Sequence, residues 1–198
     1  MNVVRLTDVP LQPWRNGGGT TRALLTWPNA GDWQVRVSVA HISADGDFSD
    51  WPGTERWFAV VEGAGVTLAL PDGRVTLRSG DLPHRFAGDV AARCTLIDGP
   101  TQDLNLMVRR RGSRSGEIGE IGEIGGIGGM RRAFAGSRAS GIAEWRALYA
   151  ADALTLELDG AVMPVAAGTL LWLASDQPVG WQVHEGDVRA WWLSWRAR

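Results

Sequence analysis

Short strand-like runs, separated by turn residues, follow one another along nearly the whole chain of 198 residues. The runs alternate apolar with polar residues or are rich in β-branched ones, and turn signals such as Pro71-Asp72-Gly73 stand between them. This pattern is typical of an all-β sandwich or barrel. Helical periodicity is scarce, and only 139–151 offers a short helical candidate. The predicted strands are 3–6, 21–27, 33–42, 56–62, 65–70, 74–78, 93–97, 104–109, 154–158, 169–174 and 188–195.

The segment 109–139 differs from its surroundings. It opens with a run of arginines, repeats Gly-Glu-Ile and ends in a glycine-rich stretch. This composition predicts a low-complexity connector with little fixed structure. The connector leaves two unequal parts, 1–108 and 140–198, and the second is short for a complete barrel. We therefore expect early strands, 3–6 and 21–27, to complete the second barrel, so that the two halves form one interlocked unit.

Composition excludes several classes of function. The formal net charge of −2 offers no broad electrostatic attraction to nucleic acid or to an anionic membrane. All 20 basic residues are arginine, which removes lysine Schiff-base chemistry. Cys94 is the sole cysteine, so no intrachain disulfide forms. The chain shows neither a signal peptide nor the roughly 20 apolar residues needed to span a bilayer. We expect a cytoplasmic protein without nucleic-acid or membrane partners.

Two predicted strands alternate cleanly between apolar and polar side chains. On strand 33–42 the valines face away from Arg36 and Ser38, and on strand 104–109 the leucines face away from Asn105. In a barrel whose outside is covered, such a polar face lines the interior and can form a ligand site. In a plain sandwich the same face is solvated, and alternation alone leaves both arrangements open.

Residues 14–21 read Trp-Arg-Asn-Gly-Gly-Gly-Thr-Thr. Three consecutive glycines allow unusual backbone conformations and the close approach of another group. Donors and acceptors surround them, so the run is either the wall of a ligand site or a plain surface loop. It matches neither the dinucleotide-binding nor the P-loop phosphate motif. The candidate ligand-binding residues of this run are Arg15, Asn16, Gly17, Gly18, Gly19 and Thr20.

The stretch 48–63 leads a Pro-Gly turn into an apolar strand ending in Glu-Gly, and 80–86 reads Gly-Asp-Leu-Pro-His-Arg-Phe. Both resemble the sequence motifs of cupins, but the metal-binding His-x-His of that family is missing, and Glu55 and Trp57 stand near its place. A transition-metal site usually needs several imidazoles or thiolates. We therefore expect no metal and no cofactor. The motif would place His84 near a barrel mouth.

Signals for catalysis are weak. The chain contains no Gly-x-Ser-x-Gly nucleophile elbow. Asp98 and Asp103 lie close in sequence and suit acid–base chemistry, although Asp beside a Gly-Pro turn commonly serves local hydrogen bonding. The eleven tryptophans, including Trp191, Trp192 and Trp195, are most simply core residues, and a stacking platform is the alternative.

Taken together, several segments resemble the HutD/Ves family of bacterial proteins. The matching motifs are Trp14–Thr21, Arg36-x-Ser38-x-Ala40, Asp45-Gly46-x-Phe48-Ser49, Pro52-Gly53-x-x-Arg56, Asp98-Gly99-Pro100, Asp103-x-Asn105-x-Met107 and Arg109-Arg110. They cover most of 10–110, and the match fades beyond. The resemblance implies an all-β bicupin, two cupin-type barrels or jelly rolls without metal ligands. It also implies an accessory role in histidine utilisation, whereas Ves-type relatives are linked to stress.

The leading hypothesis is a protein that binds a small anionic metabolite, such as urocanate or a formylglutamate-type acid, without converting it. Arginine suits this task because its guanidinium binds a carboxylate with two parallel hydrogen bonds. The rivals are a metal-free cupin isomerase or hydrolase, with Asp103 or His84 as base, and a protein-interaction module with a tryptophan-rich patch. A homodimer stays open, because cupins often dimerise through strand edges. Outside the glycine run, the candidate ligand-binding residues are Arg36, Ser38, Arg56, His84, Asp98, Asp103 and Asn105.

Overall fold

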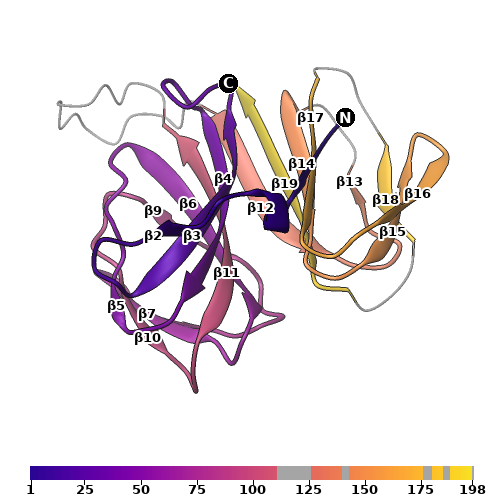
Figure 1. The fold of residues 1–198 in the computed structure, drawn as a ribbon. Helices are drawn as coiled ribbons and strands as arrows, with labels where there is room; N and C mark the ends of the chain where they lie inside the picture. Colours follow the sequence, from indigo (N-terminus) through magenta and orange to yellow (C-terminus); the bar gives the residue numbers. More distant parts are fainter. Residues whose placement is uncertain (111–125, 140–142, 176–179, 185–187, 198) are drawn as a thin grey trace. The chain divides into compact units, whose positions relative to one another are not determined.

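The computed structural model describes residues 1–110, 126–139, 143–175, 180–184 and 188–197. The regular secondary structure in these ranges consists of β-strands and one short 3-10 helix, η1 (Leu6–Asp8), which confirms the all-β prediction. The chain divides into two compact units (Figure 1). The first barrel comprises Pro10–Gly126, and the second barrel combines Met1–Val9 with Ile127–Arg198. No helix in these ranges is long and apolar enough to cross a membrane.

The first barrel consists of two antiparallel sheets. The larger sheet has the strand order β2-β3-β4-β11-β6-β9, and the smaller has β5-β10-β7-β8. The strands are β2 (Gln12–Pro13), β3 (Gly19–Trp27), β4 (Val35–Ile42), β5 (Gly46–Asp47), β6 (Thr54–Glu62), β7 (Val66–Leu70), β8 (Gly73–Leu77), β9 (His84–Ala87), β10 (Arg93–Leu96) and β11 (Thr101–Arg109). At the centre of the larger sheet, β11 pairs with β4 on one side and with β6 on the other.

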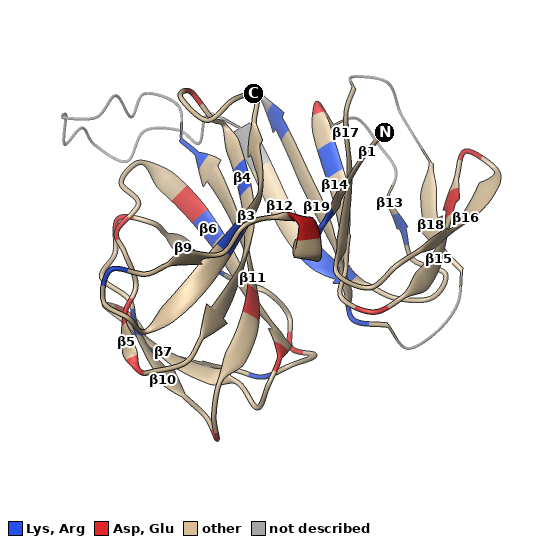
Figure 2. Ribbon diagram, in the orientation of Figure 1, with Lys and Arg blue, Asp and Glu red and all other residues tan. Residues whose placement is uncertain are grey.

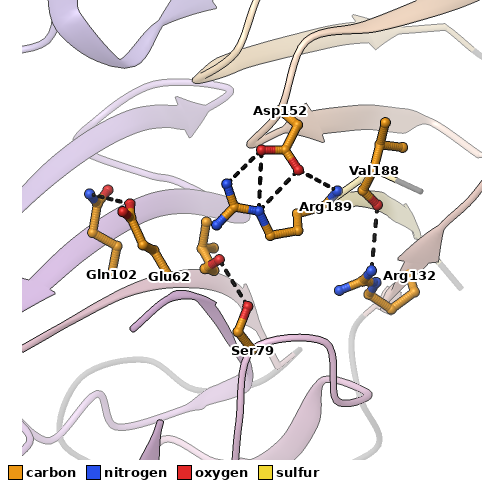
Figure 3. A network of polar contacts seen from close by, with 8 residues as sticks. Glu62, Ser79, Gln102, Arg132, Asp152, Val188 and Arg189 are labelled. Carbon is orange, nitrogen blue, oxygen red and sulfur yellow. Dashed lines mark hydrogen bonds and ion pairs between the residues drawn. The ribbon is translucent and has the colours of Figure 1, made fainter. Parts of the chain in front are cut away.

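The second barrel also consists of two sheets, with the orders β1-β17-β14-β19-β12 and β13-β18-β15-β16. Its strands are β1 (Asn2–Arg5), β12 (Gly126–Ala133), β13 (Arg138–Ala139), β14 (Trp145–Ala150), β15 (Leu154–Leu158), β16 (Ala161–Val165), β17 (Thr169–Ala174), β18 (Trp181–Val183) and β19 (Ala190–Ala197). The Asp152 carboxylate accepts hydrogen bonds from the backbone N–H of Arg189 at 2.9 Å and from its guanidinium at 2.5 Å (Figure 3). This contact ties the turn after β14 to the segment that leads into β19.

Both faces of the central strands in the first barrel are buried. The valines and leucines on one face include Val37 and Leu106, which are fully buried, as the alternation predicts. The polar residues on the other face are buried as well, with Ser38 only 2% and Asn105 only 5% exposed. Each buried Val or Leu side chain contributes about 1.5–3 kcal/mol to folding. The sequence left open whether this polar face is interior or solvated, and in the structure it lies inside the protein.

The two early strands behave differently from one another. Strand β1 pairs with β17, so the first residues of the chain complete the second barrel. The prediction that 21–27 would do the same is wrong, because β3 pairs with β4 along its length. The short link between β3 and β4 explains this difference, since consecutive strands joined by a short connection usually pair with each other.

The predicted connector is partly regular structure. Its residues 111–125 lie outside the described ranges, but 126–133 form β12 beside β19. The prediction of little fixed structure is wrong for this segment. Its glycines have a low strand propensity, but burial of Met130 and Ala133 stabilises the strand. The predicted helix over 139–151 is also wrong where the structure describes it, since 145–150 form β14. Every residue of β14 is buried, so no alternation reveals it.

Candidate functional site

Two rows of side chains cross the polar face of the larger sheet in the first barrel. In one row, Met107 of β11 lies opposite both Arg36 of β4 and Arg56 of β6, and Arg56 lies opposite Phe86 of β9. The neighbouring row lies two residues along each strand. From β4 through β11 and β6 to β9, it contains Ser38, Asn105, Phe58 and His84. Since residues two apart on a strand point to the same side, both rows face the same interior region.

Arg56 is held rigidly within this face. Its guanidinium donates a 3.1 Å hydrogen bond to Oδ1 of Asn105 and a 3.5 Å bond to the carbonyl of Ser49. The rings of Phe48 and Phe86 lie 5.2 and 5.0 Å from the guanidinium carbon. The side chain is almost fully buried, and its Nε has no hydrogen-bond partner among the described residues. Burial, followed by repulsion from Arg36, lowers the pKa of Arg56 to about 10, so the group stays charged at neutral pH.

Arg36 lies on the neighbouring strand β4 and is half-buried. It donates a 3.1 Å hydrogen bond to Oγ of Ser38, and its guanidinium lies 5.0 Å from the Trp51 ring. Burial lowers the pKa of Arg36 as well. The arginines on β4 and β6 appear as blue segments in Figure 2.

The charges of these two arginines are not balanced. Across the described ranges, neither Arg36 nor Arg56 forms an ion pair with a carboxylate. Arg189 of the second barrel is different, because Asp152 neutralises it (Figure 3). A buried charge without a partner is costly, so two adjacent cations favour the arrival of an anion. The interior face is therefore chemically suited to a small oxyanion.

Asp103 does not supply the missing negative charge. It is fully buried on β11, where Thr101 Oγ1 donates a 2.8 Å hydrogen bond to its Oδ2. Its Oδ1 has no hydrogen-bond partner within the part of the chain that the structure describes. Burial raises the pKa of Asp103 to about 8, which outweighs the opposite effect of the Thr101 hydrogen bond. The carboxyl is therefore mostly protonated at neutral pH. Burial and the nearby Asp103 also raise the pKa of the Cys94 thiol to about 12, which makes this thiol inert.

Comparison with known proteins places the fold in context. The HutD family model matches residues 6–189. The chain belongs to the HutD family. Among curated relatives, Protein Ves from Citrobacter koseri is 37% identical over 112 residues, which cover 56% of this chain and 59% of that protein. The alignment thus spans about three fifths of the length of this relative.

Solved structures agree with this assignment. HutD from Pseudomonas fluorescens SBW25 superposes with a TM-score of 0.81 at 23% identity, covering 100% of this chain and 98% of that one. A cupin 2 conserved barrel domain protein from Leptotrichia buccalis superposes with a TM-score of 0.58 at 11% identity, covering 100% and 96% of the two chains. These likenesses support the fold, and together with the family match they confirm both the HutD/Ves resemblance and the bicupin prediction.

The glycine run of this HutD-family protein has a structural role in its folding. Gly18 N donates a 3.0 Å hydrogen bond to Oδ1 of Asn16, and the Gly18 carbonyl accepts from the backbone of Ser43 at 2.9 Å. At Gly19, a Cβ atom would lie 2.4 Å from the carbonyl oxygen of His41, so only glycine lets β3 and β4 approach this closely. Gly19 therefore serves the close pairing of β3 with β4.

Among the other residues of the run, Trp14 is linked to the arginine site through Phe48. Trp14 donates a 2.7 Å hydrogen bond from Nε1 to Thr21, and its ring meets the edge of Phe48, with 6.4 Å between the ring centres. Phe48 in turn covers Arg56. Arg15, Asn16 and Gly17 are exposed, and Thr20 is half-buried at the start of β3.

The remaining predicted residues separate into two groups. His84 stacks on Phe86, with 6.0 Å between ring centres, and so lies beside the arginine site, as do Ser38 and Asn105. Asp98 is exposed in the turn between β10 and β11, where its φ of 51° shows that it serves the turn itself. Sequence analysis named Phe48 and Phe86 only within family motifs and did not propose them, or Trp51, as site residues. A usable signal was present for Phe86, because it shares the alternation of His84.

Metal ligation has no support in the described ranges, which contain no group of three or more His, Cys, Asp or Glu able to hold an ion. Glu55 and Trp57, near the positions of the cupin metal ligands, are engaged with a neighbouring arginine instead. Arg85 forms a 2.7 Å ion pair with Glu55, and its guanidinium lies 5.4 Å from the Trp57 ring.

Proposed function

We propose that this HutD-family protein binds a small organic carboxylate at the interior face of its first barrel, as an accessory component of histidine utilisation. The observation that carries the proposal is the pair of adjacent guanidinium groups, Arg36 and Arg56, with no carboxylate partner in the described ranges. A ligand carboxylate would accept hydrogen bonds from both and would supply the missing charge. Charge-assisted hydrogen bonds of this kind contribute about 1.5–3 kcal/mol each.

The surroundings of the two arginines support a preformed site. Arg56 is fixed between two aromatic rings and by Asn105, so little conformational entropy is lost when a ligand arrives. Ser38 accepts a hydrogen bond from Arg36, which leaves its own hydroxyl proton for a ligand oxygen. Trp51 and His84 offer flat surfaces for the body of the ligand. Rigid cations beside aromatic faces suit a small acid with a planar or short carbon skeleton.

The family supplies the biological setting of this proposal. A cytoplasmic role in histidine utilisation would make urocanate or a formylglutamate-type acid the ligand, and each carries the carboxylate that the arginines require. A stress-related role, of the kind linked to Ves-type relatives, would call for another small acid at the same residues.

Calorimetric titration with urocanate and with N-formylglutamate tests the proposal. We expect one of these acids to bind, and Arg36→Gln to weaken binding at least tenfold, which is about 1.4 kcal/mol. Arg74→Gln is the matched control, because Arg74 is exposed on β8 and lies outside the arginine site. Absence of binding by both acids at millimolar concentration, or unchanged affinity in Arg36→Gln, would refute the proposal.

One observation favours a second candidate, a metal-free isomerase or hydrolase. The buried Asp103 carboxyl has an unpartnered Oδ1 and, because its pKa is raised to about 8, retains a proton at neutral pH, as a general acid must. Asp103 hydrogen-bonds to Thr101 and has no contact with Arg36 or Arg56 among the hydrogen bonds described, which favours binding over catalysis. Conversion of the bound acid by the wild type, lost in Asp103→Asn, would establish the enzyme instead.

The hypothesis of a protein-interaction module required an exposed, tryptophan-rich patch. Trp191, Trp192 and Trp195 are at most 5% exposed, so all three rings are buried, and Trp192 belongs to the core of the second barrel. A homodimer remains a proposal, which light scattering of the purified protein would test.

A further inference from the structure

Asn105 lies at the centre of the interior face of the first barrel. On β11 it pairs with Ser38 of β4 on one side and with Phe58 of β6 on the other, and only 5% of its surface is exposed. Its Oδ1 accepts the 3.1 Å hydrogen bond from the buried guanidinium of Arg56. Asn105 therefore directly contacts one of the two arginines on which the proposed site depends.

This contact fixes which way the Asn105 amide faces. A guanidinium only donates hydrogen bonds, so the amide turns its oxygen toward Arg56 and its N–H groups away from it. Within the described ranges, Asn105 Nδ2 has no hydrogen-bond acceptor. Ser38, directly opposite on β4, accepts a hydrogen bond from Arg36 and so keeps its own hydroxyl proton to donate. Two neutral donors therefore lie beside the two cations and can serve the oxygens of a ligand.

Asn105 holds Arg56 without cancelling its charge. Asparagine and aspartate have nearly the same shape, and a carboxylate in the place of this amide would form an ion pair with the guanidinium. The second barrel contains such a neutralised arginine, because the Asp152 carboxylate lies 2.5 Å from the Arg189 guanidinium. With an amide at position 105, the positive charge of Arg56 stays available to a bound anion.

The acidic residues next to this pair along the two strands do not compensate Arg56 either. Asp103, two residues along β11 on the same face, accepts a hydrogen bond from Thr101, and burial raises its pKa to about 8, so its carboxyl is mostly protonated at neutral pH. Glu55 precedes Arg56 on β6 and so points to the opposite face of the sheet, where it forms a 2.7 Å ion pair with Arg85. Among the described residues, Arg56 thus has a neutral partner on β11 and no anionic one.

We propose that Asn105 is the residue that makes this interior site selective for anions, because it positions Arg56, leaves its charge uncompensated and offers an N–H donor to the same ligand. The inference rests on the proposed function, in which Arg36 and Arg56 bind a small carboxylate. A buried charge without an anionic partner lowers the stability of the ligand-free protein. A carboxylate in place of the Asn105 amide should therefore stabilise the fold and, at the same time, prevent the ligand from binding.

Asn105→Asp tests this inference in the full chain, because it replaces one N–H₂ group by an oxygen and changes little else. We expect a higher midpoint of urea unfolding than in the wild type. We also expect calorimetric titration to show roughly tenfold or weaker binding of urocanate or N-formylglutamate, whichever acid the wild type binds. Asn29→Asp is the matched control, because it adds the same charge in an exposed turn, where Oδ1 accepts hydrogen bonds from the backbone N–H groups of Gly31 and Asp32. This control should leave both measurements close to the wild-type values.

Two results would overturn the inference. If Asn105→Asp unfolds at a lower urea concentration than the wild type, or fails to fold, Asn105 has a packing role and the charge of Arg56 is not the deciding feature. If the variant is more stable but binds the acid as tightly as the wild type, Asn105 does not decide which ligand binds. Failure of the proposed function is distinguishable from both, because the two acids then fail to bind the wild type itself, and the inference falls with it.

Discussion

The buried carboxyl of Asp103 predicts an unusual dependence of stability on pH. In the unfolded chain Asp103 titrates at its ordinary pKa of 3.8, whereas in the folded protein it keeps its proton up to a pKa of about 8. The folded state therefore binds more protons than the unfolded state between these values, and the Asp103 contribution to stability falls as the pH rises through this window. Asp103→Asn removes this titration.

The magnitude follows from the two pKa values. One pKa unit corresponds to about 1.36 kcal/mol, so the wild type loses roughly 3 kcal/mol relative to Asp103→Asn between about pH 5 and about pH 8. Urea unfolding, followed by tryptophan fluorescence at several pH values, measures this difference. All other titrating groups are common to both proteins and cancel when the two free energies of unfolding are subtracted.

Asp98→Asn is the matched control. Asp98 is exposed in a turn at a φ of 51°, a conformation that asparagine tolerates well, so this variant should follow the wild-type pH profile. If the free energies of unfolding of the wild type and Asp103→Asn run parallel from pH 5 to pH 8, the Asp103 carboxyl is not desolvated and the argument from burial fails.

Two further predictions concern the first barrel. Gly19→Ala should lower the free energy of unfolding by about 1–3 kcal/mol, because its Cβ would lie 2.4 Å from the backbone oxygen of His41. Gly18→Ala, whose Cβ meets its nearest atom at 3.5 Å, should cost less, and urea unfolding that ranks the two the other way would contradict this. Cys94 should not react with a thiol reagent such as DTNB in the folded protein, since its pKa is raised to about 12 and it is buried. Urea should restore the reaction, and rapid labelling of native protein would refute the burial.

Much of the fold was predictable because strand signals are local. The alternation of apolar and polar residues correctly predicted strand 33–42, its apolar face and the shared face of Arg36 and Ser38. A period of two residues can be recognised from side chains that are close in sequence. The missing His-x-His pattern led to the expectation of a barrel without the cupin metal ligands, and that expectation stays a prediction. The resemblance to the HutD/Ves family then supplied the bicupin architecture, which strand signals alone left undecided.

The candidate site was only half predictable. Arg36, Arg56, Ser38 and Asn105 were identified from the sequence, and the structure brings them into two adjacent rows on one face. The glycine run was predicted to bind a ligand, and the structure shows that Gly19 is needed where β3 pairs closely with β4. Neighbours along the chain cannot show which strand will pass within contact distance.

The sequence by itself determined where many of the strands lie, which side chains share a face on strand 33–42, and that all 20 residues of the Lys/Arg class are arginine. Only the tertiary structure decided that the polar face is buried, that β12 is a strand despite its glycines, and that Asp103 retains its proton. Alternation depends on residues close in sequence, whereas burial, strand partners and the pKa of a buried acid depend on residues that only folding brings together.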